Sequence, residues 1–200
     1  REGAAELGFD ALGHVLRRVA FDVRRSADGD SDRRLGAAAA LSKLVRHVRQ
    51  HEPVLSRFGL HLLWGALEAA KSSKGGAVAA HAAAASERLA AAIEHHVRRK
   101  GDAAQLLAPS QDIARERPRT VADLCHGLLE DGAAAPNEAF RRRAWRTLGQ
   151  LAPLVAGSSR DLFQRALPGA AAAVRLLKFG SEALDQRRAT VHCCATFVQR

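Results

Sequence analysis

Apolar side chains recur three or four residues apart along most of this chain, and short polar breaks interrupt the pattern. Spacing of this kind places the apolar residues on one side of an α-helix. The first such stripe consists of Leu12, Val15, Leu16, Val19 and Val23. The spacing therefore predicts a first helix over residues 2–25, with this stripe turned toward the core.

Seven further helices are expected after the first. The next five stripes lie within Leu35–Val48, Val54–Leu67, Val78–Val97, Val121–Leu129 and Phe140–Leu151. Pro53 suits the first turn of the third helix, because the amide hydrogen that proline lacks has no partner there. The seventh helix covers residues 161–179, where Pro168 is expected to kink or split it. The eighth follows Gly180 and runs to Arg200.

Composition agrees with an all-α fold and excludes other classes. The chain has 42 Ala but only nineteen Val, Ile and Thr residues together and no Tyr, so the residues that favour strands are scarce. No apolar run approaches the roughly 18 to 20 residues that cross a bilayer, so we expect no membrane partner. Three cysteines cannot form a disulfide framework, which suits a reducing compartment. The chain begins at Arg1 and contains no Met, so we interpret it as an internal piece of a longer protein.

Pairs of helices joined by short turns favour an α-solenoid of the HEAT or armadillo kind, in which stacked hairpins share one continuous core. The expected hairpins cover residues 2–50, 53–100, 119–152 and 159–199. Arginines precede small or apolar runs at Arg33, Arg88, Arg142 and Arg188, in steps of 55, 54 and 46 residues. These steps are interpreted as a helical repeat with long loops, and the alternative is a globular helical domain in which the arginines coincide by chance.

Basic residues surround an irregular segment, residues 100–119, where the helical spacing fails. Its candidate partner-binding residues are Arg98, Arg99, Lys100, Arg115, Arg117 and Arg119. Against three carboxylates they leave residues 98–119 with a net charge of +3. Arginine contacts phosphate well, but no aromatic residues are interleaved for stacking, so any nucleic-acid binding would be non-specific and salt-sensitive. A solvated face with pairs such as Glu138 with Arg142 is the alternative.

A second basic cluster stands at the start of the sixth helix, at Arg141, Arg142, Arg143 and Arg146. Over the whole chain 31 basic residues oppose 21 acidic ones, and residues 137–200 carry +7 of the net +10. Such a field favours nucleic acid or acidic protein surfaces. With 26 Arg and only 5 Lys, a GC-rich coding sequence explains the arginines equally well.

No catalytic or metal-binding arrangement has useful spacing. The turn Ser72–Gly76 lacks the order of residues that lets a phosphate loop surround its ligand, and the motifs of a kinase catalytic domain are absent. Cys125-His126 and His192-Cys193-Cys194 put adjacent ligands about 100° apart on a helix, so we interpret them as buried packing. Trp64 and Trp145 are interpreted as packing anchors. We therefore expect no catalytic residue, metal or cofactor in these residues.

The turn from Arg25 to Ala37 resembles the DNA-dependent protein kinase catalytic subunit family, which belongs to the phosphatidylinositol-3-kinase-related kinases. The matching features are an arginine-rich helix end, a Ser26-Ala27-Asp28 turn and Asp32-Arg33-Arg34-Leu35-Gly36-Ala37 at the next helix start. The likeness continues in the segments Ala92–Val97, Leu124–Leu129, Arg141–Ala144 and Leu151–Val155. It covers residues 15–164 in patches, with Ser31 as an insertion in the turn.

The resemblance implies an amino-terminal HEAT-repeat arm of a very large nuclear serine/threonine kinase. Such an arm would cradle double-stranded DNA ends and the Ku heterodimer in non-homologous end joining, next to neighbouring repeats of the same chain. ATP and Mg would bind the distant kinase domain of the parent protein, and this segment would be non-catalytic. The alternative is a generic HEAT-repeat scaffold that binds protein partners and has no DNA role.

Overall fold

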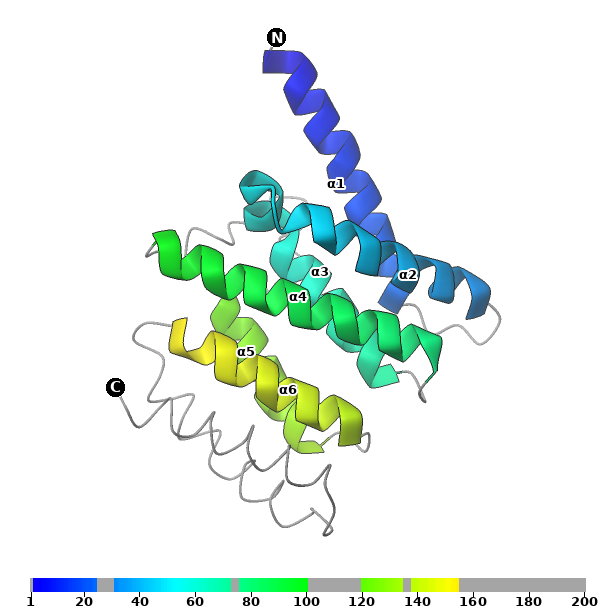
Figure 1. The fold of residues 1–200 in the computed structure, drawn as a ribbon, viewed down its shortest axis with the longest axis vertical. Coiled ribbons are helices and arrows are strands. Elements are labelled where there is room, and N and C mark those ends of the chain that lie inside the picture. The colour runs from blue at the N-terminus through cyan, green and yellow to red at the C-terminus, as the bar shows by residue number, and fades with distance from the viewer. Residues whose placement is uncertain (1, 25–30, 73–75, 101–119, 135–137, 155–200) are drawn as a thin grey trace. The chain divides into compact units, whose positions relative to one another are not determined.

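The computed structural model of the protein describes residues 2–24, 31–72, 76–100, 120–134 and 138–154. These residues form helices and contain no β-strand (Figure 1), so the all-α prediction is confirmed for the described part. The elements are α1 (Glu2–Arg24), α2 (Ser31–Val48), α3 (Glu52–Ser72), α4 (Ala77–Lys100), α5 (Val121–Ala134), α6 (Glu138–Leu151) and the 3-10 helix η3 (Ala152–Leu154). The expected seventh and eighth helices and the hairpin at 159–199 lie outside the described residues.

α2 to α6 each begin after a polar or glycine-containing break in the apolar spacing. At the start of α3 the carbonyl of His51 accepts hydrogen bonds from the amides of Val54 and Leu55, at 3.0 and 2.9 Å. Pro53 follows inside the first turn, as the sequence predicts. α4 begins directly after Gly76. The φ angle of Gly76 is 84°, a backbone conformation that glycine adopts easily and that is strained for other residues. The helix bounds therefore follow from short-range signals.

A capping box fixes the start of α5. The hydroxyl oxygen of Thr120 accepts the amide of Asp123 at 3.0 Å, and the carboxylate of Asp123 accepts the amide of Thr120 at 3.1 Å. Two amide groups that the helix leaves without partners are thereby satisfied. The pattern Thr-x-x-Asp in the sequence is the signal for this cap.

The contacts divide the chain into two compact units, Arg1–Leu89 and Ala90–Arg200, and the boundary between them falls inside α4. In the first unit α1 and α3 pack closely and run in the same direction. Gly13 of α1 lies against the Phe58 ring of α3, and further along both helices Ala20 lies against Gly65. Small residues at both crossings let the two backbones approach.

α2 runs antiparallel to both of these helices. Near its start Arg34 reaches Val23 near the end of α1 and Ala69 near the end of α3. From the first half of α4, Arg88 donates a hydrogen bond to the carbonyl of Ser42 in α2 at 3.4 Å. Figure 1 shows α2 in front of α3 in this unit.

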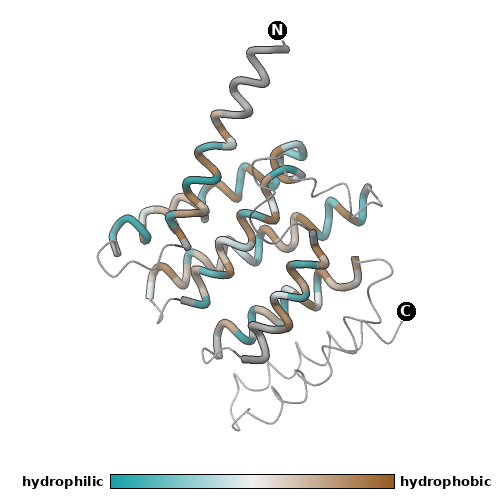
Figure 2. Tube along the Cα trace, turned by 180° about the vertical axis from the view of Figure 1, so that it is seen from behind, coloured by the Kyte–Doolittle hydropathy of each residue, from teal (hydrophilic) through white to brown (hydrophobic). Residues whose placement is uncertain are grey.

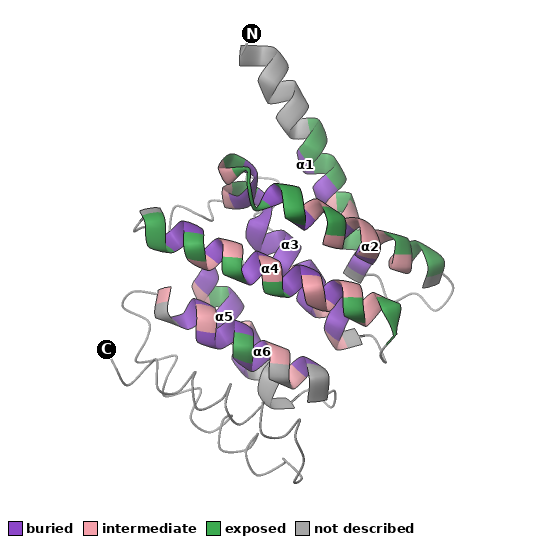
Figure 3. Cartoon of the chain, in the orientation of Figure 1, coloured by how far each residue is buried: buried purple, intermediate pink, exposed green. Residues whose placement is uncertain are grey.

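Burial follows the predicted stripes with two exceptions. Leu16, Ala20 and Val23 of α1 are fully buried, and α3 is buried on nearly every side (Figure 3). Leu12 and Val15, in contrast, are 37% and 51% exposed. The prediction that they belong to the core is wrong, because they flank the line along which α1 meets α2 and α3. Figure 2 shows the resulting alternation of apolar and polar residues along the helices.

The arginine repeat remains a prediction, and its first two members stand at different positions in their helices. Arg33 stands in the first turn of α2, whereas Arg88 stands in the middle of α4, so the two are not at matching levels. The helix contacts show a shorter spacing. Residues 13 and 58, and likewise 20 and 65, meet across α1 and α3 at a separation of 45 residues. Ser42 and Arg88 meet across α2 and α4 at a separation of 46.

In the second unit α5 and α6 form a hairpin, and η3 continues from α6 and contacts both helices. Its core contains Leu124 and Leu128 from α5 and Phe140, Trp145 and Leu148 from α6. Phe140 and Trp145 are among the largest fully buried side chains in the described part of the chain. Burial of such rings is the main favourable term in joining two short helices.

Candidate nucleic-acid interface

The structure places only part of the predicted partner-binding set. Arg98 and Arg99 lie exposed in the last turn of α4, and Lys100 is the last residue of that helix. Arg115, Arg117 and Arg119 lie outside the described residues, as does the rest of the irregular segment. The described half of the set is therefore a short cationic helix end. Cations are favoured there because the carbonyl end of a helix carries partial negative charge.

Arg98 is held by its own helix. Its Nε lies 3.0 Å from Oε1 of Glu94, one turn earlier, and the two side chains are 56% and 26% exposed. An exposed pair of this kind contributes little, roughly 0.3 to 0.5 kcal/mol. The guanidinium therefore remains free to exchange Glu94 for an external anion at small cost.

The second basic cluster, on α6, is less exposed than a ligand-binding surface would be. Arg141 and Arg143 are half-buried, Arg146 is exposed, and all three make contacts within the protein. The side chain of Arg142 lies outside the described residues.

Arg34 has a structural role that the sequence pattern did not indicate. Its Nε donates to the carbonyl of Val23 at 3.2 Å and its Nη2 donates to the carbonyl of Ala69 at 3.3 Å. Both carbonyls belong to the last turn of their helices, where no intrahelical donor follows. One guanidinium group thus caps α1 and α3 together from the start of α2.

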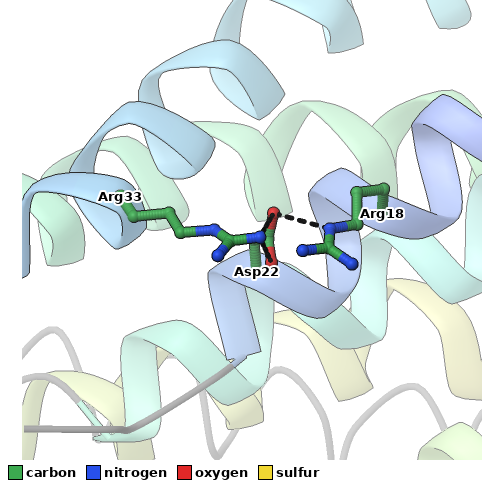
Figure 4. Close-up of polar contacts among 3 residues, drawn as sticks. All are labelled: Arg18, Asp22 and Arg33. Carbon is green, nitrogen blue, oxygen red and sulfur yellow. Dashed lines mark hydrogen bonds and ion pairs between the residues drawn. The ribbon is translucent and has the colours of Figure 1, made fainter. Parts of the chain in front are cut away.

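Asp22 of α1 pairs with Arg18 of its own helix and with Arg33 of α2, so the Arg33 pair joins the first two helices (Figure 4). Nε of Arg18 lies 3.2 Å from Oδ2 of Asp22, and Nη2 of Arg33 lies 3.2 Å from its Oδ1. The Arg33 hydrogen bond goes to Oδ2 at 3.3 Å. The carboxylate is only 13% exposed while the arginines are 54% and 42% exposed, so this cluster faces the hairpin more than the solvent.

Most arginines of the first unit are therefore engaged in the fold. Arg17 donates to the carbonyl of Gly13, and Arg57 stacks over the Phe58 ring at 5.8 Å. Together with Arg18, Arg33, Arg34 and Arg88 they account for six of the unit's described arginine side chains. High arginine content in this unit consequently reflects carbonyl capping and ion pairing as much as any external ligand.

The exception is a cluster at the carboxyl end of α2 and in the turn that follows it, which the sequence interpretation missed. Lys43, Arg46, His47 and Arg49 are all exposed, and none of their side chains bonds to a described residue. We call these four residues the α2 basic patch. The nineteen residues from Arg33 to His51 contain no Asp or Glu, a run of sequence that could have revealed the patch.

The remaining candidate residues that the structure describes are buried or half-buried. Cys125 is fully buried in α5 and Trp145 in α6, as the packing interpretation predicted, and Trp64 is half-buried in α3. His192-Cys193-Cys194 lies outside the described residues. Nε1 of Trp145 finds no hydrogen-bond acceptor among the described residues.

Among the described helices, none has both the length and the apolar character required to span a membrane. No protein-family model, no curated protein and no solved structure matches the chain.

Proposed function

We propose that this chain is a segment of a HEAT/armadillo-like α-solenoid that serves as a scaffold. The observation that carries the proposal is the spacing in the first unit, where α1 and α3 run side by side and a hydrogen bond joins α2 to α4. Their contacts join residues 45 or 46 positions apart. This separation lies within the length of about 40 to 47 residues of HEAT and armadillo repeats. Stacking of this kind leaves the outer helix faces available for partners.

The partner proposal rests on the resemblance around Arg25–Ala37. It assigns the scaffold to a DNA-dependent protein kinase catalytic subunit, a nuclear serine/threonine kinase that acts in double-strand break repair. In this proposal the segment cradles DNA ends and the Ku heterodimer, while ATP and Mg bind elsewhere in the parent kinase. Arg33 and Arg34, within the best-matching turn, bond to Asp22 and to two helix carbonyls. Their positions therefore support a role in holding the first hairpin.

Recovery of Ku and of blunt-ended duplex DNA by the 200-residue chain tests the partner proposal. Replacement of Arg98, Arg99, Lys100, Arg115, Arg117 and Arg119 by Gln is expected to weaken DNA retention and flatten its salt dependence. Each lost phosphate contact lowers the slope of log affinity against log salt by about one. Retention that is unchanged across the salt series removes these six residues from the interface.

A generic protein-binding scaffold is the second candidate. It is favoured by Arg34 and Arg88, which are half-buried and donate to backbone carbonyls of other helices rather than facing an external phosphate. Recovery of tubulin or transport factors, with neither Ku nor DNA, would establish this alternative and exclude the first.

A further inference from the structure

The α2 basic patch differs from the other described cation clusters of the first unit, because its side chains have no partner among the described residues. Lys43 and Arg46, and likewise Arg46 and Arg49, stand three residues apart. Side chains at this spacing are neighbours on a helix surface, so like charges repel by a few tenths of a kcal/mol. His47 lies four residues from Lys43 on the same face. Placement at the helix end relieves part of this repulsion, and a bound polyanion would relieve the rest.

The composition of the patch distinguishes between kinds of polyanion. Protein interfaces depend on buried aromatic or aliphatic anchors, whereas contacts to a phosphate backbone need none. The large apolar side chains that are exposed in the described part of the chain are Leu12, Val15 and Phe21, all on α1. The α2 basic patch has none, so a phosphate backbone fits it better than a protein surface does.

We propose that the α2 basic patch binds the sugar-phosphate backbone of duplex DNA without regard to sequence or to strand ends. Lys43 and Arg46 of α2 and Arg49 of the turn after it supply three permanent charges, and His47 adds a further donor. The inference deepens the proposed function and rests on it for the choice of DNA. The α2 basic patch lies outside the six residues of the proposed interface. It is expected to bind duplex DNA whether or not a strand end is present.

The test compares the 200-residue chain with its K43Q/R46Q/R49Q variant. Fluorescence anisotropy is measured between about 50 and 200 mM salt. One probe is a blunt-ended duplex, and the other is the same duplex closed at both ends by hairpin loops. Removing three phosphate contacts should lower the magnitude of the salt slope by about 2.7 on both probes. The control R17Q/R18Q/R57Q removes the same charge from residues that have partners in the fold, and should change the slope far less. Circular dichroism verifies that each variant is folded.

Each other outcome has a separate meaning. The inference is overturned if the salt slope is unchanged in K43Q/R46Q/R49Q. If binding is at the same time lost in the variant that replaces Arg98, Arg99, Lys100, Arg115, Arg117 and Arg119 by Gln, the proposed function still stands. A loss confined to the blunt-ended probe shows that the patch reads ends, and overturns the inference as stated. Equal competition by polyglutamate or by anionic vesicles indicates an acidic protein or a lipid surface, and also overturns it. If the unaltered chain binds neither duplex at low salt, the DNA role itself falls together with the inference.

Discussion

Arg34 illustrates how one residue can close three helices against each other. Its two hydrogen bonds reach residues 11 and 35 positions away, at the ends of α1 and α3. The last carbonyls of a helix have no hydrogen-bond donor within the helix. The half-buried guanidinium of Arg34 donates to one such carbonyl of each helix, in place of water. Because the donor is charged, each bond is stronger than a neutral one.

Replacing Arg34 by Ala should therefore destabilise the first unit. Hydrogen bonds to charged groups contribute about 1.5 to 3 kcal/mol, so we expect a loss of roughly 2 kcal/mol in the free energy of unfolding, measured by urea denaturation. R33A is the matched control. It removes an adjacent arginine whose pairing with Asp22 is exposed on one side, and should cost less than about 1 kcal/mol. Equal losses in the two variants would contradict the capping role of Arg34.

Among the elements, the crossing of α1 and α3 is the most tightly constrained. A Cβ placed on Gly13 would lie 2.6 Å from Cζ of Phe58, and one placed on Gly65 would lie 3.3 Å from Cβ of Ala20. Phe58 is only 2% exposed, so its ring has little room to move away. Glycine is thus required here by packing, although it is unfavourable inside a helix.

Gly13→Ala should destabilise the protein by about 1 to 3 kcal/mol, because overpacking a closed core outweighs the better helix propensity of Ala. Gly36→Ala provides the opposite case. Gly36 is exposed in α2 and nothing lies within 4 Å of the point that a Cβ would occupy there, so this change should stabilise by up to about 1 kcal/mol. Thermal unfolding of both variants gives the comparison. Stabilisation by G13A would show that α1 and α3 do not approach as described.

At the scale of the whole molecule, the large apolar side chains that are exposed in the described part all lie on α1. Val15 is 51% exposed and Phe21 46% exposed, and Arg18 covers one face of the Phe21 ring at 5.9 Å. Apolar groups left in water favour association with other apolar surfaces. The chain on its own is therefore expected to self-associate through α1.

V15S/F21S should reduce this association, as measured by light scattering over a concentration series. Both residues are exposed, so the free energy of unfolding should change little apart from the cation–π contact of Phe21, about 0.5 to 1 kcal/mol. V15S alone retains that contact and should lower association in part. Scattering that is unchanged in both variants would mean that another surface drives association.

The sequence by itself determined the class of fold and the helix bounds within the described residues. Apolar spacing, Pro53 and the breaks near Gly29 and Gly76 act over four residues or fewer, so they can be interpreted without knowing the fold. The same spacing assigned Val15 to the core together with Leu16. Periodicity alone does not say how wide a strip the neighbouring helices cover.

Only the tertiary structure decided which cations are engaged. Arg34 and Arg88 find carbonyls 35 and 46 positions away, whereas Lys43 and Arg46 find no partner among the described residues. In the sequence all four are basic residues of helices. Their different roles arise because the packing of α1, α2, α3 and the first half of α4 brings distant carbonyls to the first two residues and leaves the other two in solvent.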